Sequence, residues 1–124
     1  MAFIRFQDLE VYKLAEQLED AVWEIVNEWS ILARDTVGKQ LIRSADSIGA
    51  NIAEGTGRTT FADNRRFVGM ARGSLYETQH WLRRAFKRKL LKAKQTTELQ
   101  RVMEKLGPKL NAYLRSIGRT TRAK

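Results

Sequence analysis

The sequence predicts an all-α fold, an antiparallel up-and-down bundle of four helices. Apolar residues recur at steps of three and four in four separate stretches, which is the spacing of amphipathic helices. No stretch of useful length alternates apolar and polar residues as a strand would. The 124 residues include a single proline, the residue that helix interiors tolerate least. Helices with short connections pack as a bundle, and residues 1–124 suffice for one domain with its own core.

The first two helices are expected at about residues 8–29 and 36–54. The first carries acidic residues on the side opposite its apolar stripe. In the second, Thr36 is the expected N-cap, because its hydroxyl can accept a hydrogen bond from a free N–H of the first turn. Gly55 and Gly57 are expected to end this helix, since glycine takes the positive φ of many helix ends.

The third and fourth helices are expected at about residues 60–89 and 96–117. Thr60, with an acidic residue three positions later, resembles a capping box at the start of the third helix. Pro108 lies inside the fourth helix and should kink or break it, because proline lacks an N–H and crowds the preceding turn. Gly118 is expected to end the fourth helix.

A small, polar face is predicted on the second helix, beside its apolar stripe. Its residues are Ser44, Ser47, Asn51 and Glu54. The third helix offers Gly69 and Gly73 one turn apart, so we expect the two helices to cross closely around a structural polar network. Its members would be Asn51, Glu54, Arg72 and Glu77. A buried amide without partners would cost roughly 1–3 kcal/mol. Plain bundle packing, a subunit interface and a ligand site are alternative interpretations of these residues.

The composition argues against several classes of enzyme. The chain has no cysteine, which excludes a disulfide scaffold, a thiolate metal site and a cysteine nucleophile. His80 is the single histidine and lacks partners at helix-face spacing, so no catalytic or metal-binding role is expected for it. The glycines at 55 and 57 are not followed by the Lys-Ser or Lys-Thr of a phosphate-binding loop. We expect no enzymatic activity, no cofactor and no metal.

The chain is expected to be a cytoplasmic protein. Its first 20 residues are studded with charge, unlike the apolar centre of a signal peptide. No apolar run approaches the roughly 20 residues of a membrane span, so no membrane partner is expected.

Charge is distributed unevenly along the chain. Residues 1–57 hold 5 Lys and Arg against 10 Asp and Glu, a net charge of −5. Residues 58–124 hold 18 against 4, a net charge of +14, and the whole chain carries +9. A basic half of this kind favours a polyanionic partner or an acidic protein surface.

The densest basic run spans the end of the third helix and the connection after it. Its cations are Arg83, Arg84, Lys87, Arg88, Lys89, Lys92 and Lys94, with no acid among them. We expect this run to bind RNA or DNA through phosphates, with Trp81 and Phe86 able to stack on bases or to pack internally. Arg115, Arg119 and the basic tail at 118–124, with Arg122 and Lys124, would extend it. No sequence-reading motif is present, so little base discrimination is expected.

Two alternative interpretations of the basic charges remain open. In the first, the basic residues would pair with the acidic first helix of a neighbouring subunit, which would explain the uneven charge without any nucleic acid. Alternatively, they would only keep an assembly soluble.

Three stretches resemble one known family. They are FQDLEVYKLAEQL near the N-terminus, ADSIGANIAEGTGR around Asn51, and ARGSLYET on the third helix. Together they resemble the four-helix-bundle family of the 23S rRNA intervening-sequence proteins, from Phe6 to about Ile117. The resemblance implies a four-helix bundle that assembles as a ring-like homopentamer.

The run SLYETQHWLRRAFKRKLL is similar to one branch of that family, the accessory variability determinant (Avd) of diversity-generating retroelements. This likeness implies a non-enzymatic accessory protein that binds the reverse transcriptase. Through its basic surface it would bind RNA or DNA without strong sequence specificity and support mutagenic reverse transcription. The alternative is an intervening-sequence scaffold whose partner is unknown or is rRNA, with its charges serving oligomer assembly.

Overall fold

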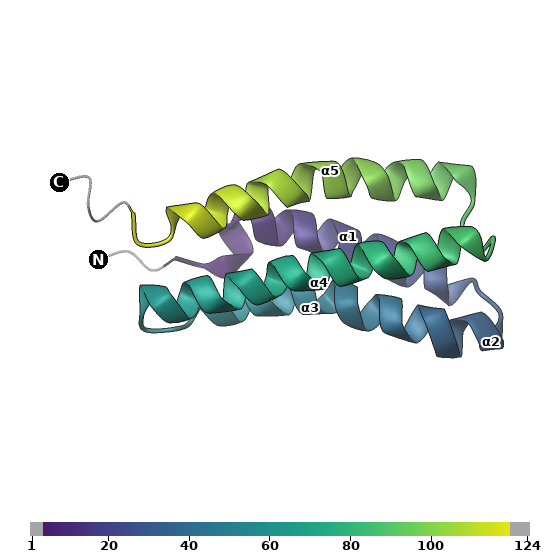
Figure 1. The fold of residues 1–124 in the computed structure, drawn as a ribbon, viewed down its shortest axis with the longest axis horizontal. Coiled ribbons are helices and arrows are strands. Elements are labelled where there is room, and N and C mark those ends of the chain that lie inside the picture. The colour runs from purple at the N-terminus through teal and green to yellow at the C-terminus, as the bar shows by residue number, and fades with distance from the viewer. Residues whose placement is uncertain (1–3, 120–124) are drawn as a thin grey trace.

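A computed structural model describes residues 4–119 and shows an all-helical fold with no strand in that range (Figure 1). The elements are the 3₁₀ turn η1 (Phe6–Asp8), α1 (Glu10–Asn27), α2 (Ile31–Ala33), the π-helical turn η2 (Arg34–Gly38), α3 (Lys39–Thr56), α4 (Phe61–Lys87) and α5 (Ala93–Ser116). The four long helices lie along one another and alternate in direction. The predicted four-helix architecture is confirmed within the described residues, and Arg122 and Lys124 of the expected basic tail lie outside them.

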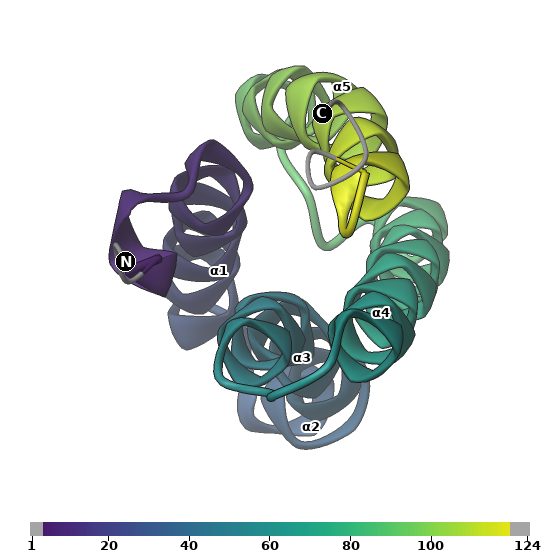
Figure 2. The same ribbon diagram turned by 90° about the vertical axis from the view of Figure 1, so that its left-hand side faces the viewer.

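The core runs along the axis of the bundle. Figure 2 shows α1, α3, α4 and α5 in that order around the axis, so that each long helix has two neighbours. The largest fully buried apolar side chains come from all four helices: Leu18, Val22, Leu41, Ile48, Ile52, Val68, Leu99, Leu106 and Leu110. Full burial of one such side chain stabilises the fold by roughly 1.5–3 kcal/mol.

The second helical stretch begins earlier than predicted. Ser30, in extended backbone, is the N-cap, and its hydroxyl accepts a hydrogen bond from the N–H of Ala33 at 3.5 Å. Thr36 lies inside the helical stretch, where its hydroxyl donates to the carbonyl of Leu32 at 2.7 Å. The expectation of Thr36 as N-cap was therefore wrong, because an N-cap needs the extended backbone that only Ser30 adopts here.

The glycines near residue 55 act only in part as expected. Gly55 is buried inside α3, where an added Cβ would lie 2.6 Å from Oδ1 of Asn64. Gly57 is the C-cap that ends α3, as predicted, but its φ is −83°, so no positive φ is needed there. Gly118 does end α5 as predicted, with a φ of 83°. Close packing of α3 on α4 therefore explains Gly55, and backbone conformation explains Gly118.

Pro108 does not break the fourth helix, since α5 continues through it from Ala93 to Ser116. Pro108 and Glu104, one turn earlier, are both exposed. Water can therefore bond the Glu104 carbonyl that proline leaves without an N–H donor.

Within residues 4–119, no helix combines the length and the apolar character that crossing a membrane requires.

Candidate nucleic-acid interface

The seven predicted cations lie together at one end of the bundle, where α4 turns into α5. We call this set the basic loop: Arg83, Arg84, Lys87, Arg88, Lys89, Lys92 and Lys94. Arg84 is partly buried and the other six are exposed. Among residues 4–119, no carboxylate forms an ion pair with any of them. The basic loop therefore presents uncompensated positive charge to solvent.

Backbone hydrogen bonds define the path of the basic loop. Lys89 has a φ of 61°, in the left-handed region, and the following N–H, of Leu90, donates to the Ala85 carbonyl at 2.9 Å. At the start of α5, the N–H of Lys92 donates to the side-chain oxygen of Gln95 at 2.9 Å. From the α1–α2 connection, the indole N–H of Trp29 donates to the Leu90 carbonyl at 3.0 Å. Arg88, Lys89 and Lys92 are thus carried on a connection held at several points, and the other four cations lie on the helices at either side of it.

The helix ends add to the positive charge. The first turn of α5 contains no acidic residue, so the positive end of its dipole is not neutralised by a side chain. The last turn of α4 holds Arg84 and Lys87, which the negative end of that helix stabilises. The helix end does not neutralise these charges, so all seven cations of the basic loop remain available for a ligand.

The two aromatic residues of this region have different roles. Phe86 is 59% exposed beside the basic loop. Trp81 packs partly against the core, and its indole N–H donates to Glu77 at 3.2 Å. The ring of His80 contacts the Trp81 ring edge-on, with centroids 4.8 Å apart. Phe86 is therefore the aromatic residue free to stack on a base.

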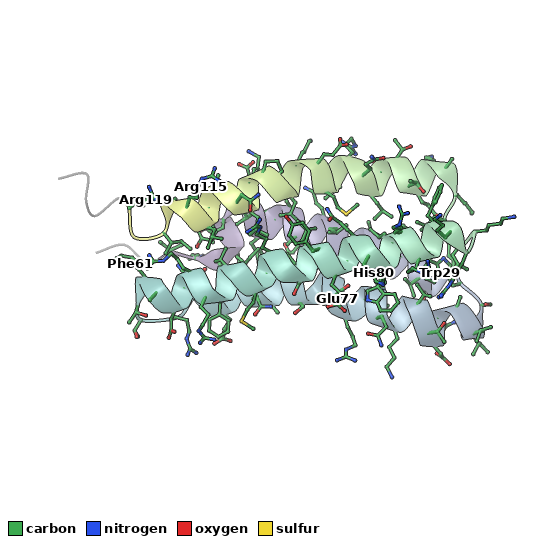
Figure 3. All side chains as sticks on the ribbon, viewed as in Figure 1. Trp29, Phe61, Glu77, His80, Arg115 and Arg119 are labelled. Carbon is green, nitrogen blue, oxygen red and sulfur yellow. The ribbon has the colours of Figure 1, made fainter. Side chains whose placement is uncertain are left out.

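Arg115 and Arg119 lie at the opposite end of the bundle, with Phe61 (Figure 3). The 27 residues of α4 separate the two ends by about 40 Å at roughly 1.5 Å per residue. The expectation that these arginines extend the basic loop is therefore wrong, because antiparallel helices carry the end of α5 back to the start of α4.

Arg115 and Arg119 instead line a separate pocket of about 420 Å³. We call it the arginine pocket, and its lining residues are Phe61, Arg65, Arg115, Ile117, Gly118 and Arg119. Arg65 crosses from α4 to donate to the Ile117 carbonyl at 3.0 Å, which holds the end of α5 on α4. Residues 4–119 thus place cationic side chains at both ends of the bundle.

The predicted polar network does not form in the described chain, because each of its members bonds within its own helix or helix end. Asn51 donates to the Ser47 carbonyl at 2.8 Å, and Glu54 pairs with Arg58 at 3.1 Å. On α4, Arg72 contacts Tyr76 and Glu77 contacts Trp81.

The polar contact between α3 and α4 is instead a buried one between hydroxyls, in which Thr78 donates to Ser44 at 3.0 Å. Gly69 and Gly73 are exposed, with no atom within 4 Å of an added Cβ, so they do not form the predicted close crossing.

A partly buried carboxylate between α1 and α3 was missed by the sequence reasoning. Glu19 accepts a hydrogen bond from the backbone N–H of Gly49 at 3.0 Å. Burial raises its pKa to about 7, and the nearby Asp46 adds to the increase, while the Gly49 bond opposes it. A Cβ at position 49 would overlap the carboxylate, so a larger residue there would have to displace the Glu19 side chain from its hydrogen bond.

No metal site is evident, since residues 4–119 contain no group of three or more His, Cys, Asp or Glu side chains placed to hold an ion.

On α1, Glu10 pairs with Lys109 of α5 at 2.8 Å. Part of the acidic surface of α1 is therefore already neutralised within the chain.

Comparison with known proteins shows likenesses in sequence and in fold. The family model described as 23S rRNA-intervening sequence protein matches residues 7–112, which include the whole basic loop. A crystal structure of a protein with unknown function, from the S23 ribosomal protein family of Bacteroides thetaiotaomicron, is similar in fold, with a TM-score of 0.65. It is 24% identical and covers 82% of this chain and 98% of its own, an identity that supports the fold alone. No curated protein matches the chain.

Proposed function

The chain belongs to the family of 23S rRNA-intervening sequence proteins, and we propose that it is a non-enzymatic RNA-binding bundle. Its basic loop would hold the phosphate backbone of RNA without reading the base sequence. The observation that carries this proposal is the set of seven cations gathered at the end of α4, the connection after it and the start of α5, without an ion pair in the described chain.

Phosphate is the ligand that this arrangement suits. Like charges at this density repel one another, and a polyanion removes that repulsion. Each phosphate that is neutralised also releases condensed counterions, which favours binding strongly at low salt. The family description names 23S rRNA, which makes RNA the polyanion to test first.

The alternative of pairing with an acidic α1 from another subunit has less support. Glu10 is already paired within the chain, and the raised pKa of Glu19 leaves that group only partly charged at neutral pH. The remaining acids of α1 would have to neutralise most of the positive charge of the basic loop.

Charge reversal tests the proposal directly. We expect Lys87→Glu, Arg88→Glu and Lys92→Glu together to abolish measurable RNA binding at low salt in fluorescence anisotropy. The matched control reverses Arg34, Lys39 and Arg43, which are also exposed and carry the same charge. Equal loss in both variants, or no loss in either, would contradict the assignment to the basic loop, provided that circular dichroism shows both variants folded.

A more specific role is that of an Avd-type accessory to a retroelement reverse transcriptase. Besides the sequence likeness, one structural feature favours a protein partner. Ile31 and Leu32 are 74% and 76% exposed, at the end of the bundle where Trp29 contacts the basic loop. An apolar surface beside a cationic one suits an enzyme that itself holds nucleic acid.

This role predicts that a reverse transcriptase copurifies with the tagged protein from its host, even after nuclease treatment. Ile31→Ser with Leu32→Ser should remove the enzyme while leaving RNA binding intact. Recovery of RNA-bound proteins that disappear with nuclease would instead favour the simpler RNA-binding role.

The assembly implied by the resemblance is a homopentamer. Light scattering should then give five times the 14.3 kDa mass of one chain. A monomer mass at working concentration would remove the pentamer and leave RNA binding to be tested separately.

A further inference from the structure

The groove between α4 and α5 opens beside the basic loop. It has a volume of about 350 Å³, within the roughly 300–1,000 Å³ of small-ligand sites. Leu82, Leu91 and Leu99 line its apolar surface, and Phe86 and Arg83 belong to its lining as well. The groove and the cations therefore form one continuous surface at the end of α4.

Phe86 is the unusual member of this lining. Its ring is 59% exposed, and five cations of the basic loop lie within three residues of it in the sequence. An exposed aromatic ring next to cations suits a flat, apolar group that is attached to an anion. A nucleotide has this composition, because its base can stack on the ring while its phosphate meets the cations.

Polar groups are available to meet the edge of such a base. Gln79 from α4 and Gln100 from α5 face the groove, and neither carboxamide has a hydrogen bond in the described chain. A carboxamide both donates and accepts, as the edge of a base does. Arg83, which is without an ion pair, adds a planar cation that can stack on a base or bond a phosphate.

We propose that this groove receives an unpaired base of the bound RNA, stacked on Phe86, so that the protein prefers single-stranded or looped RNA to a continuous duplex. The inference rests on the proposed RNA binding and adds the class of RNA to it. A paired base is enclosed in the helical stack and cannot enter the groove, whereas a loop base can turn outward.

The test compares two RNAs, a hairpin with an unpaired loop and a continuous duplex of equal phosphate number, by fluorescence anisotropy. The wild-type protein should bind the hairpin more tightly. Phe86→Ala should weaken hairpin binding by about 10-fold, the loss expected from one stacking aromatic, and leave duplex binding within about 2-fold. Phe86→Trp should retain the preference.

Tyr76→Ala is the matched control. Tyr76 lies on the same helix with a similar exposure of 57%, contacts Arg72, and is not part of the groove. The Tyr76→Ala variant should bind both RNAs as the wild type does. Equal affinity of the wild type for both RNAs would overturn the inference, as would an equal effect of Phe86→Ala on both.

Three further outcomes separate this inference from its premise. If reversal of the basic loop abolishes binding while Phe86→Ala has no effect, RNA binding stands and the base site fails. If Phe86→Ala changes the mass in light scattering, a second copy of the chain occupies the groove and the base site also fails. If reversal of the basic loop has no effect, the proposed function itself fails.

Discussion

The indole nitrogen of Trp29 lies 3.0 Å from the carbonyl oxygen of Leu90, although 61 residues separate them in sequence. This hydrogen bond joins the α1–α2 connection to the α4–α5 connection at one end of the bundle. The basic loop is therefore positioned in part by a residue from the acidic half of the chain. A cationic surface that is held in place loses less conformational entropy when it binds a polyanion.

Trp29→Phe should loosen the basic loop without unfolding the protein. The ring can still pack, but the Leu90 carbonyl loses its donor, which should lower the free energy of unfolding by about 1 kcal/mol. RNA affinity should fall by about 2-fold or less, because all cations remain. Urea denaturation and anisotropy measure the two effects. Trp23→Phe is the control, since Trp23 is exposed and has no hydrogen bond within residues 4–119; an equal loss there would contradict the role of the bond.

Lys89→Gly should remove one charge from the basic loop and at the same time raise the stability of the fold. Lys89 has a φ of 61°, which costs an L-residue roughly 1–2 kcal/mol and glycine almost nothing. After the entropy that glycine loses on folding, a net gain of about 0.5 kcal/mol is expected. The salt dependence of RNA binding should become shallower by roughly 0.7–0.9 in log–log slope, for one lost phosphate contact.

Lys87→Gly provides the matched comparison for that variant, since it removes the same charge from the last helical turn of α4. It should lower stability by up to about 1 kcal/mol, because glycine is unfavourable within a helix. A higher melting temperature for Lys87→Gly than for Lys89→Gly would be incompatible with the left-handed conformation at Lys89.

Stability should decrease as pH rises through the range in which Glu19 titrates. Its pKa is raised by burial to about 7 from an ordinary value of 4.5. The folded state therefore binds more protons than the unfolded chain between those values, so the contribution of protonated Glu19 is lost as pH rises through about 7. Allowing for solvent screening, the loss should be about 1–2 kcal/mol between pH 5 and pH 8.

Glu19→Gln removes the titration and keeps an oxygen that can accept from Gly49. Its stability in urea should change less between pH 5 and pH 8 than that of the wild type. Glu24→Gln, at an exposed position of the same helix, should keep the wild-type pH dependence. Parallel pH profiles for the wild type and Glu19→Gln would assign the effect to other groups.

The two cationic ends should act independently on a short RNA. They lie about 40 Å apart, several times the Debye length of roughly 8 Å at physiological salt. Arg115→Glu with Arg119→Glu should therefore change the affinity for a hairpin smaller than the bundle by less than about 2-fold. A larger loss in anisotropy would show that the arginine pocket is the main RNA site. Arg101→Glu with Lys105→Glu is a control of equal charge in the middle of α5.

Much of the fold could be predicted along the chain, because helix periodicity and capping are local. The spacing of apolar residues located all four long helices to within a few residues, apart from the start of the second. Thr60 caps α4 as predicted, its side chain accepting a hydrogen bond from the N–H of Asp63 at 3.0 Å. The charge asymmetry and the basic loop were equally visible, since they depend on which residues follow one another.

The candidate site was only partly predictable, because exposure depends on which helix covers a side chain. Phe86 and Trp81 are similar in sequence terms, yet only Phe86 points to solvent beside the groove. Gly69 and Gly73 have the spacing of a helix contact, but the rotation of α4 places them on its outer side. Likewise, the burial of Glu19 depends on α3 lying against α1, which no local pattern reports.

The local sequence therefore accounts for the helices, their caps and the cluster of cations. The packing of antiparallel helices accounts for the rest. It places Arg115 and Arg119 at the far end from the basic loop, seats the Trp29 indole on Leu90, and opens a groove beside Phe86. The physical reason is that helix formation depends on neighbours within a turn, whereas the exposure and partners of a side chain depend on residues brought close only by folding.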